Sequence, residues 1–230
     1  MLRKERYTHI LKWFQDNMPD AKTELNYTDA FSLICAVSLS AQCTDKRINM
    51  VIPALMKSYP TPEALASAKI QDVKELIYSV SFPNNKSKHL IDMAKQLVKN
   101  YHSVVPSTVE EIEKLPGCGR KTANVVTSII NNNPVIAVDT HVFRVSRRIG
   151  LTRGTTPLKV EKDLTKNIPK DLRAISHHWL ILHGRYICKA RKPLCNQCGI
   201  TKYCAYYEKM EKEILKEILK KDKAMKKISK

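Results

Sequence analysis

The stretch "IEKLPGCGRKTANVV", residues 112–126, decides the fold. Pro116 ends one helical pattern, and a second helical pattern follows over 120–131. Gly117 and Gly119 predict a tight turn between them, because glycine adopts backbone conformations that are closed to other residues. Glycines also leave the first N–H groups of the second helix open to an anion. The stretch therefore predicts a helix–hairpin–helix that holds a phosphate.

Lys121 lies in the first turn of the second helix, beside Arg120. The positive end of the helix dipole and the neighbouring charge are both expected to lower the lysine pKa, which suits a nucleophilic amine. A phosphate contact is the alternative. Asp139, in "AVDTHVFRVSRR" (residues 137–148), is suited to proton transfer or to stabilising positive charge on a sugar ring. Taken alone, an aspartate at this position is more typical of an N-cap for the helix that follows.

The charge balance indicates a polyanionic partner. Forty Lys and Arg against 22 Asp and Glu give a net charge of +18, which favours nucleic acid first and an anionic membrane surface second. The lysine-rich tail, 209–230, holds only part of this excess, since basic residues also recur through 86–100 and 185–192. There is no secretory signal pattern and no apolar run of 18 residues. We expect a cytoplasmic protein that does not engage a membrane.

The apolar pattern predicts an all-α fold, because helical spacing recurs along the chain and sustained period-two alternation is absent. Ser107 and Glu110 have the spacing of a capping box, Pro53 predicts a kink or break, and "NNNP" at 131–134 predicts a domain crossover. In the tail, the first half is expected to be helical and the last eight residues disordered. Further helices are expected over 45–58, 62–67, 71–80, 86–100, 108–115, 140–149, 156–167 and 171–188.

Four of the seven cysteines fall within seventeen residues, with the spacing C-x6-C-x2-C-x5-C. They are Cys188, Cys195, Cys198 and Cys204. In an intracellular chain this pattern predicts a soft tetrahedral site, either zinc or iron–sulfur. One CxxC pair with two wider gaps modestly favours a 4Fe–4S cluster. Three basic residues in the enclosed loop are suited to contact phosphate: Lys189, Arg191 and Lys192.

Four segments together resemble the endonuclease III family of helix–hairpin–helix DNA glycosylases/AP lyases. They are "LPGCGRKTANVV", "VDTHVFRVSRR", "HHWLILHGRYIC" and the cysteine array, in this order. The resemblance covers about residues 5–205 and implies two all-α domains. The implied parts are an N-terminal helix (1–22) belonging to the cluster domain, a six-helix barrel (23–133) with the helix–hairpin–helix at about 108–131, an iron–sulfur cluster domain (134–208) and a basic tail (209–230).

The resemblance implies a base-excision-repair enzyme that acts on duplex DNA as a monomer. It would remove oxidised or damaged pyrimidines and nick the abasic site by β-elimination through a lysine imine. Lys121 matches the family's nucleophile and Asp139 its catalytic aspartate. The four cysteines match the ligands of a 4Fe–4S cluster.

The wedge loop departs from the family pattern. The family tends to have glycine–leucine–tyrosine where "SVSFPNNKSKHL" (79–90) has Ser81, Phe82 and Pro83. Phe82 would be the wedge, but the family's lesion preference does not carry over to this loop. In "LSAQCTDKRIN", Gln42 would fill the gap left by the extruded base and Asp45 would approach the substrate. The remaining expected DNA contacts are Gly117, Gly119, Arg120, His141, Lys189, Arg191 and Lys192.

Two alternatives to this function remain open. One is a mismatch-specific glycosylase, for A·G or T·G, although such enzymes usually have serine or tyrosine in place of Lys121. The adenine type also usually carries an extra C-terminal domain, and few residues follow Cys204 here. The other is a non-catalytic DNA-binding iron–sulfur protein, either a structural clamp or a redox sensor. The pairing of Lys121 with Asp139 favours an enzyme, because phosphate binding needs no carboxylate.

Overall fold

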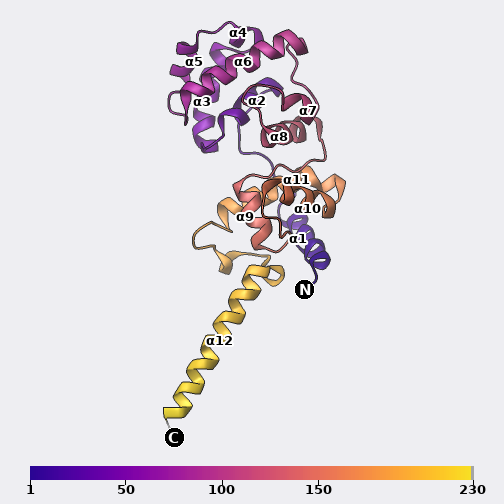
Figure 1. Cartoon of the computed structure of the whole chain (residues 1–230), viewed down its shortest axis with the longest axis vertical. Helices are drawn as coiled ribbons and strands as arrows, with labels where there is room; N and C mark the ends of the chain where they lie inside the picture. Colours follow the sequence, from indigo (N-terminus) through magenta and orange to yellow (C-terminus); the bar gives the residue numbers. More distant parts are fainter. Residues whose placement is uncertain (229–230) are drawn as a thin grey trace. The chain divides into compact units, whose positions relative to one another are not determined.

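The computed structural model describes residues 1–228, and side chains as far as residue 220. Over this range the chain is helical and contains no strand, which confirms the all-α prediction (Figure 1). Contacts between Cα atoms divide the chain into two compact units. We call residues 23–137 the hairpin unit, and residues 1–22 with 138–230 the cysteine unit. Each unit is described separately.

The hairpin unit contains seven α-helices: α2 (Ala30–Leu39), α3 (Asp45–Ser58), α4 (Pro62–Ala66), α5 (Ile70–Leu76), α6 (Pro83–Tyr101), α7 (Val109–Ile112) and α8 (Arg120–Asn131). Almost every residue of α2 is apolar and buried, because this helix packs against α3, α6 and α8. Asp29 starts α2 by accepting the Ser32 N–H at 2.7 Å. Pro53 lies inside α3, which continues past it. Of the kink or break expected at Pro53, the break is therefore wrong.

The helix before the hairpin begins one residue later than predicted and is shorter. Thr108, not Ser107, caps α7: its hydroxyl accepts the Glu111 N–H at 3.3 Å and donates to the Glu111 carboxylate at 2.6 Å. Both pairs have capping-box spacing; the second pair caps α7, with the Glu111 carboxylate bound to the Thr108 hydroxyl rather than to the Thr108 backbone N–H. The chain then turns, with the Cys118 N–H donating to the Leu115 carbonyl at 3.0 Å, before α8 begins.

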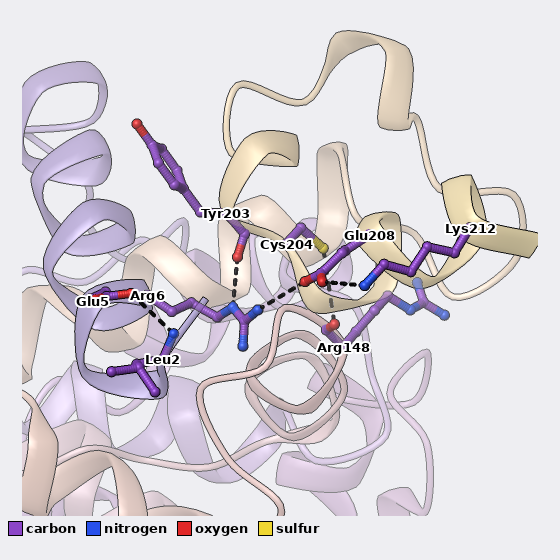
Figure 2. A network of polar contacts seen from close by, with 8 residues as sticks. All are labelled: Leu2, Glu5, Arg6, Arg148, Tyr203, Cys204, Glu208 and Lys212. Carbon is purple, nitrogen blue, oxygen red and sulfur yellow. Dashed lines mark hydrogen bonds and ion pairs between the residues drawn. The ribbon is translucent and has the colours of Figure 1, made fainter. Parts of the chain in front are cut away.

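The cysteine unit joins both ends of the chain. Its helices are α1 (Arg3–Asn17), α9 (Thr140–Arg148), α10 (Pro157–Asn167), α11 (Arg173–Tyr186) and α12 (Ala205–Ile228), with short 3₁₀ turns η1 (Lys170–Leu172), η2 (Cys195–Gln197) and η3 (Thr201–Tyr203). The buried Arg6 of α1 donates to the Tyr203 carbonyl at 2.7 Å and pairs with Glu208 at 3.5 Å (Figure 2). The Phe14 ring stacks on Trp179, whose indole N–H donates to the Met18 carbonyl at 2.7 Å.

The C-terminal helix is longer than predicted. α12 runs to Ile228, so the expected disorder of the last eight residues is wrong over 223–228, while 229–230 lie outside the described residues. The side chains of 211–220 are exposed, and they include the apolar Ile214, Leu215, Ile218 and Leu219. Among the helices that the structure describes, none is long and apolar enough to cross a membrane.

Candidate functional site

The two glycines of the hairpin differ in what the fold demands of them. Gly117 has φ +77°, and a Cβ built there would lie 2.9 Å from the Cβ of His89. The backbone and its packing therefore both require glycine at this position. Gly119, the N-cap of α8, has φ −93°, and a Cβ there would meet nothing within 4 Å. Its open space leaves room for an external group at the start of a twelve-residue helix.

Lys121 is exposed in the first turn of α8. Thr122 to Ser128 are all buried, so α8 enters the core directly after its N-terminal end, and Lys121 lies at the exposed end of the helix. The exposed Arg120 lies 4.0 Å from the Glu113 carboxylate, a weak surface ion pair. The start of α8 thus combines an open backbone with two exposed cationic side chains.

Asp139 caps α9, as the simpler of its two interpretations predicts. One carboxylate oxygen accepts the Val142 N–H at 2.7 Å, and the side chain is half-buried. His141 lies 3.2 Å from an Arg144 nitrogen, through its Nδ1. Asp139 belongs to the cysteine unit and Lys121 to the hairpin unit.

Gln42 and Phe82 occupy left-handed backbone conformations, with φ of 55° and 56°. Such conformations are uncommon for residues other than glycine and concentrate at functional sites. Both side chains are exposed, Phe82 to 59%. Asp45 follows closely as the first residue of α3, after the N-cap Thr44. The hairpin unit therefore carries a polar and an aromatic side chain at the tips of two loops.

The four clustered cysteines line one pocket of the cysteine unit, with about 300 Å³ of empty space that is partly open to solvent. Ile149, Ile187 and Leu194 supply apolar walls. Burial raises the pKa of the Cys198 thiol to about 11, and it also raises the pKa of Cys195 and Cys204. As thiols without a metal, these groups therefore stay neutral at pH 7.

Metal binding would displace those thiol protons. Among the described residues, no group of three or more His, Cys, Asp or Glu has the arrangement of a metal site. The fit with an iron–sulfur cluster rests instead on the four thiols that share this apolar pocket.

Two arginines that the sequence did not single out bind backbone carbonyls from the end of α11 into residues 189–194, which we call the cysteine loop. Arg144 donates to the carbonyls of Gly184 and Cys188, at 2.8 and 3.2 Å. Arg148 donates to the carbonyls of Lys189 and Ala190, at 2.7 and 3.2 Å. The pattern "FRVSRR" indicates only a basic helix, since backbone carbonyls leave no mark in a sequence.

The basic side chains of the cysteine loop face solvent. Lys189, Arg191 and Lys192 are all exposed, and Lys192 has φ 50°. Because Arg148 binds the carbonyls at the start of this loop, the charges extend from an anchored backbone.

Comparisons with known proteins agree on one family. The family model described as "HhH-GPD superfamily base excision DNA repair protein" matches residues 35–170, a range that contains Lys121 and Asp139. Endonuclease III of Rickettsia felis is 49% identical over 198 residues, covering 86% of this chain and 93% of the relative. Endonuclease III of Escherichia coli is 40% identical over 210 residues, covering 91% and 100%.

Solved structures agree as well. A non-covalent endonuclease III–DNA complex has a TM-score of 0.87 at 40% identity, covering 92% of this chain and 100% of that chain. A thermostable thymine-DNA glycosylase, with a TM-score of 0.81 at 19% identity over 89% and 98% of the two chains, shares the fold.

Proposed function

The chain belongs to the HhH-GPD superfamily of base excision DNA repair proteins, and from this membership we propose that it is a bifunctional DNA glycosylase and AP lyase. Its substrate is duplex DNA that contains an oxidised or damaged pyrimidine, or an abasic site. The observation that carries the proposal is the exposed Lys121 in the first turn of α8, two residues after Gly119, around which there is open space. The relatives named endonuclease III support the reaction type.

Lys121 acts as the nucleophile. Its neutral amine attacks the anomeric carbon of the damaged nucleotide, the new C–N bond replaces the glycosidic bond, and the base leaves and takes up a proton. Opening of the sugar ring gives an imine. Loss of a C2′ proton then expels the 3′ phosphate and nicks the strand, and water releases the lysine.

Asp139 handles protons and charge in this reaction. One carboxylate oxygen is held by the Val142 N–H, which fixes the side chain at the start of α9. The second oxygen accepts the proton that the attacking amine loses and stabilises positive charge on the sugar.

The hairpin glycines and the two loop tips bind the DNA. Backbone N–H groups around Gly117 and Gly119 hold a phosphate, which sets the register of the strand. Phe82 enters the stack as an apolar wedge while Gln42 fills the space of the extruded nucleotide. The exposed Lys189, Arg191 and Lys192 bind further phosphates, and His141 and Asp45 lie closer to the lesion.

The four cysteines would hold a 4Fe–4S cluster in the pocket that they share. Bound there, the group supplies a fixed frame for the basic loop rather than a reacting atom. Arg148 supports the same loop by binding the carbonyls of Lys189 and Ala190. The cluster's contribution is therefore to DNA binding and to folding of the cysteine unit.

A lesion panel tests the proposed function. Duplexes with thymine glycol, dihydrouracil, an abasic site, an A·G mismatch or a T·G mismatch are assayed separately for base release and for nicking. We expect release and nicking with the oxidised pyrimidines, and nicking at the abasic site. Activity confined to the mismatches, or DNA binding without any product, would contradict the proposal.

A further inference from the structure

Lys86 is a cation that the fold uses internally. It lies near the start of α6, half-buried, and its ammonium group donates to the carbonyls of Leu39 at 2.8 Å and Ala41 at 2.6 Å. A third hydrogen bond, at 3.1 Å, reaches the Ser81 hydroxyl. An ammonium group has three protons, so these bonds use its full donor capacity. Lys86 is therefore committed to the protein rather than to a DNA phosphate.

Ser81 extends this network to the neighbouring loop. Its hydroxyl lies 3.2 Å from the Ala41 carbonyl and 2.9 Å from the Gln42 carbonyl, and donates to them. The same oxygen accepts from Lys86. We call residues 40–44 the Gln42 loop and residues 78–82 the Phe82 loop. Lys86 and Ser81 together form a polar joint between these two loops.

The joint lies beside both strained residues. A left-handed conformation costs roughly 1–2 kcal/mol for a residue other than glycine, and it persists only where its surroundings hold it. Gln42 is held through its own carbonyl, by Ser81. Phe82 directly follows Ser81, and its carbonyl accepts the backbone N–H of Lys86 at 3.1 Å, as the first hydrogen bond of α6. The side chains of Lys86 and Ser81 thus restrain the backbone at 39–42 directly and that of Phe82 through the adjoining Ser81.

We propose that Lys86 and Ser81 are positioning residues that lock the Gln42 loop and the Phe82 loop into one preformed unit, so that both tips enter the duplex together. This inference rests on the proposed function. Ordering the loops before DNA arrives removes an entropic cost from the step that extrudes the nucleotide. The hydroxyl at position 81 is a feature of this chain, since the family pattern tends to have glycine there. The hydrogen bonds of the joint run to the backbone of residues 39–42, so it acts on extrusion rather than on bond breaking.

The variant Lys86→Met tests the joint, because it keeps the length of the side chain but removes all three donors. Extrusion is followed by the fluorescence of 2-aminopurine placed next to the lesion, and base release is measured on the same duplex. We expect both rates to fall about tenfold or more, since small misplacements of positioning groups cost rate on this scale. Nicking at an abasic site, where no base must leave the stack, falls by less than about threefold.

Lys88→Met is the matched control, because it removes the same charge from an exposed position of the same helix. It is expected to change both reactions about equally. Ser81→Ala removes only the hydroxyl and should lower the rate of extrusion. Ser81→Thr keeps the hydroxyl and should extrude at the wild-type rate. The double variant Lys86→Met with Ser81→Ala loses less than the product of the two single effects, because one joint is broken.

The outcomes separate the two proposals. If wild-type protein gives no product from any damaged duplex, the proposed function fails. If wild-type protein is active, the ratio of base release to abasic-site nicking is compared between Lys86→Met and Lys88→Met. The same ratio in both variants would overturn the proposed role of the joint. Thermal unfolding monitors folding of each variant. If Lys86→Met does not fold, Ser81→Ala decides, and an unchanged 2-aminopurine signal in that variant overturns the joint.

Discussion

Gly117 and Gly119 stand two residues apart in one turn, yet they are glycine for different reasons. The left-handed backbone at Gly117 and the nearby His89 side chain require the absence of a Cβ. At Gly119 the protein itself would tolerate a methyl group, since open space surrounds the position. A glycine that the fold does not need points to a group that approaches from outside, and under the proposed function that group is a DNA phosphate.

A pair of alanine substitutions separates these roles. Gly117→Ala should lower the free energy of unfolding by about 1–2 kcal/mol or more, because of the left-handed φ and the contact with His89. Gly119→Ala should change stability by less than about 0.5 kcal/mol but weaken binding to an abasic-site duplex about tenfold. Denaturant unfolding and fluorescence anisotropy measure the two quantities. Equal effects of both substitutions on stability and on binding would refute the distinction.

Among single residues, the sequence reveals those whose roles are carried by local pattern. Gly117 and the cap at Asp139 follow from glycine in a turn and from an acidic residue before a helix. The joint of Lys86 and Ser81 could not be predicted, because it binds backbone carbonyls some 40 positions away, which any sequence would supply. The capping pair is an intermediate case: "PSTVEE" contains two pairs of the right spacing, and only the structure distinguishes them.

At the scale of elements, one face of α9 binds the backbone at the start of the cysteine loop through two arginines. Arg144 and Arg148 are four residues apart and therefore lie on the same side of the helix. Together they bind four carbonyls between Gly184 and Ala190. The helix periodicity was predictable, but the partner of this basic face was not, since the loop that it binds follows 40 residues later.

Removing one of these arginines should weaken retention of the proposed cluster. Arg148→Met frees the Lys189 and Ala190 carbonyls, so the loop loosens and chelator-induced loss of absorbance near ~400 nm should be about threefold faster or more. Arg147→Met is the matched control, because the exposed Arg147 stacks on Phe143, at 5.0 Å, rather than on the loop. Equal rates of cluster loss in the two variants would show that Arg148 has no such role.

Helix α11 contributes a dependence of stability on pH. Burial lowers the pKa of His178 from its usual 6.5 to about 4, so the imidazole is neutral when folded and takes up a proton on unfolding. The free energy of unfolding therefore suffers no penalty from His178 above about pH 6.5, and it decreases as the pH falls from 6.5 toward 4. Between pH 7 and pH 5 the loss amounts to about 2 kcal/mol. His178→Gln should reduce the pH dependence of unfolding by this amount, and an unchanged pH profile would contradict it.

For the whole molecule, the net charge of +18 is spread over more than the tail. Residues 209–230 contain nine lysines and four acidic residues, a net +5. The greater part of the positive charge therefore belongs to residues 1–208, where Arg120, Lys189 and Arg191 are exposed. Composition thus predicts the class of partner. It does not predict that the tail continues as one helix, α12, to Ile228.

Salt dependence tests where this charge acts. The logarithm of the DNA association constant should fall steeply and linearly with the logarithm of salt concentration. Deleting residues 213–230 should reduce the slope by a minority of its value, because the proposed phosphate contacts lie in the hairpin and the cysteine loop. Loss of most of the slope on deletion would place the DNA-binding surface on α12 instead.

The all-α fold and the hairpin were predictable because glycine, proline and helical spacing are local signals. The pairing of Lys121 with Asp139 in one reaction belongs to the proposed function and could not be predicted from local pattern. Eighteen positions and a change of unit separate them in the chain, and the family supplies the reason to pair them.

Borohydride trapping on an abasic-site duplex tests the central claim most directly. Reduction converts the imine of Lys121 into a stable protein–DNA adduct, which migrates as one slow band on a denaturing gel. We predict a trapped adduct with wild-type protein and none with Lys121→Ala, while Arg120→Ala, which keeps the amine, still traps. Absence of an adduct from wild-type protein, or an undiminished adduct from Lys121→Ala, would contradict the account.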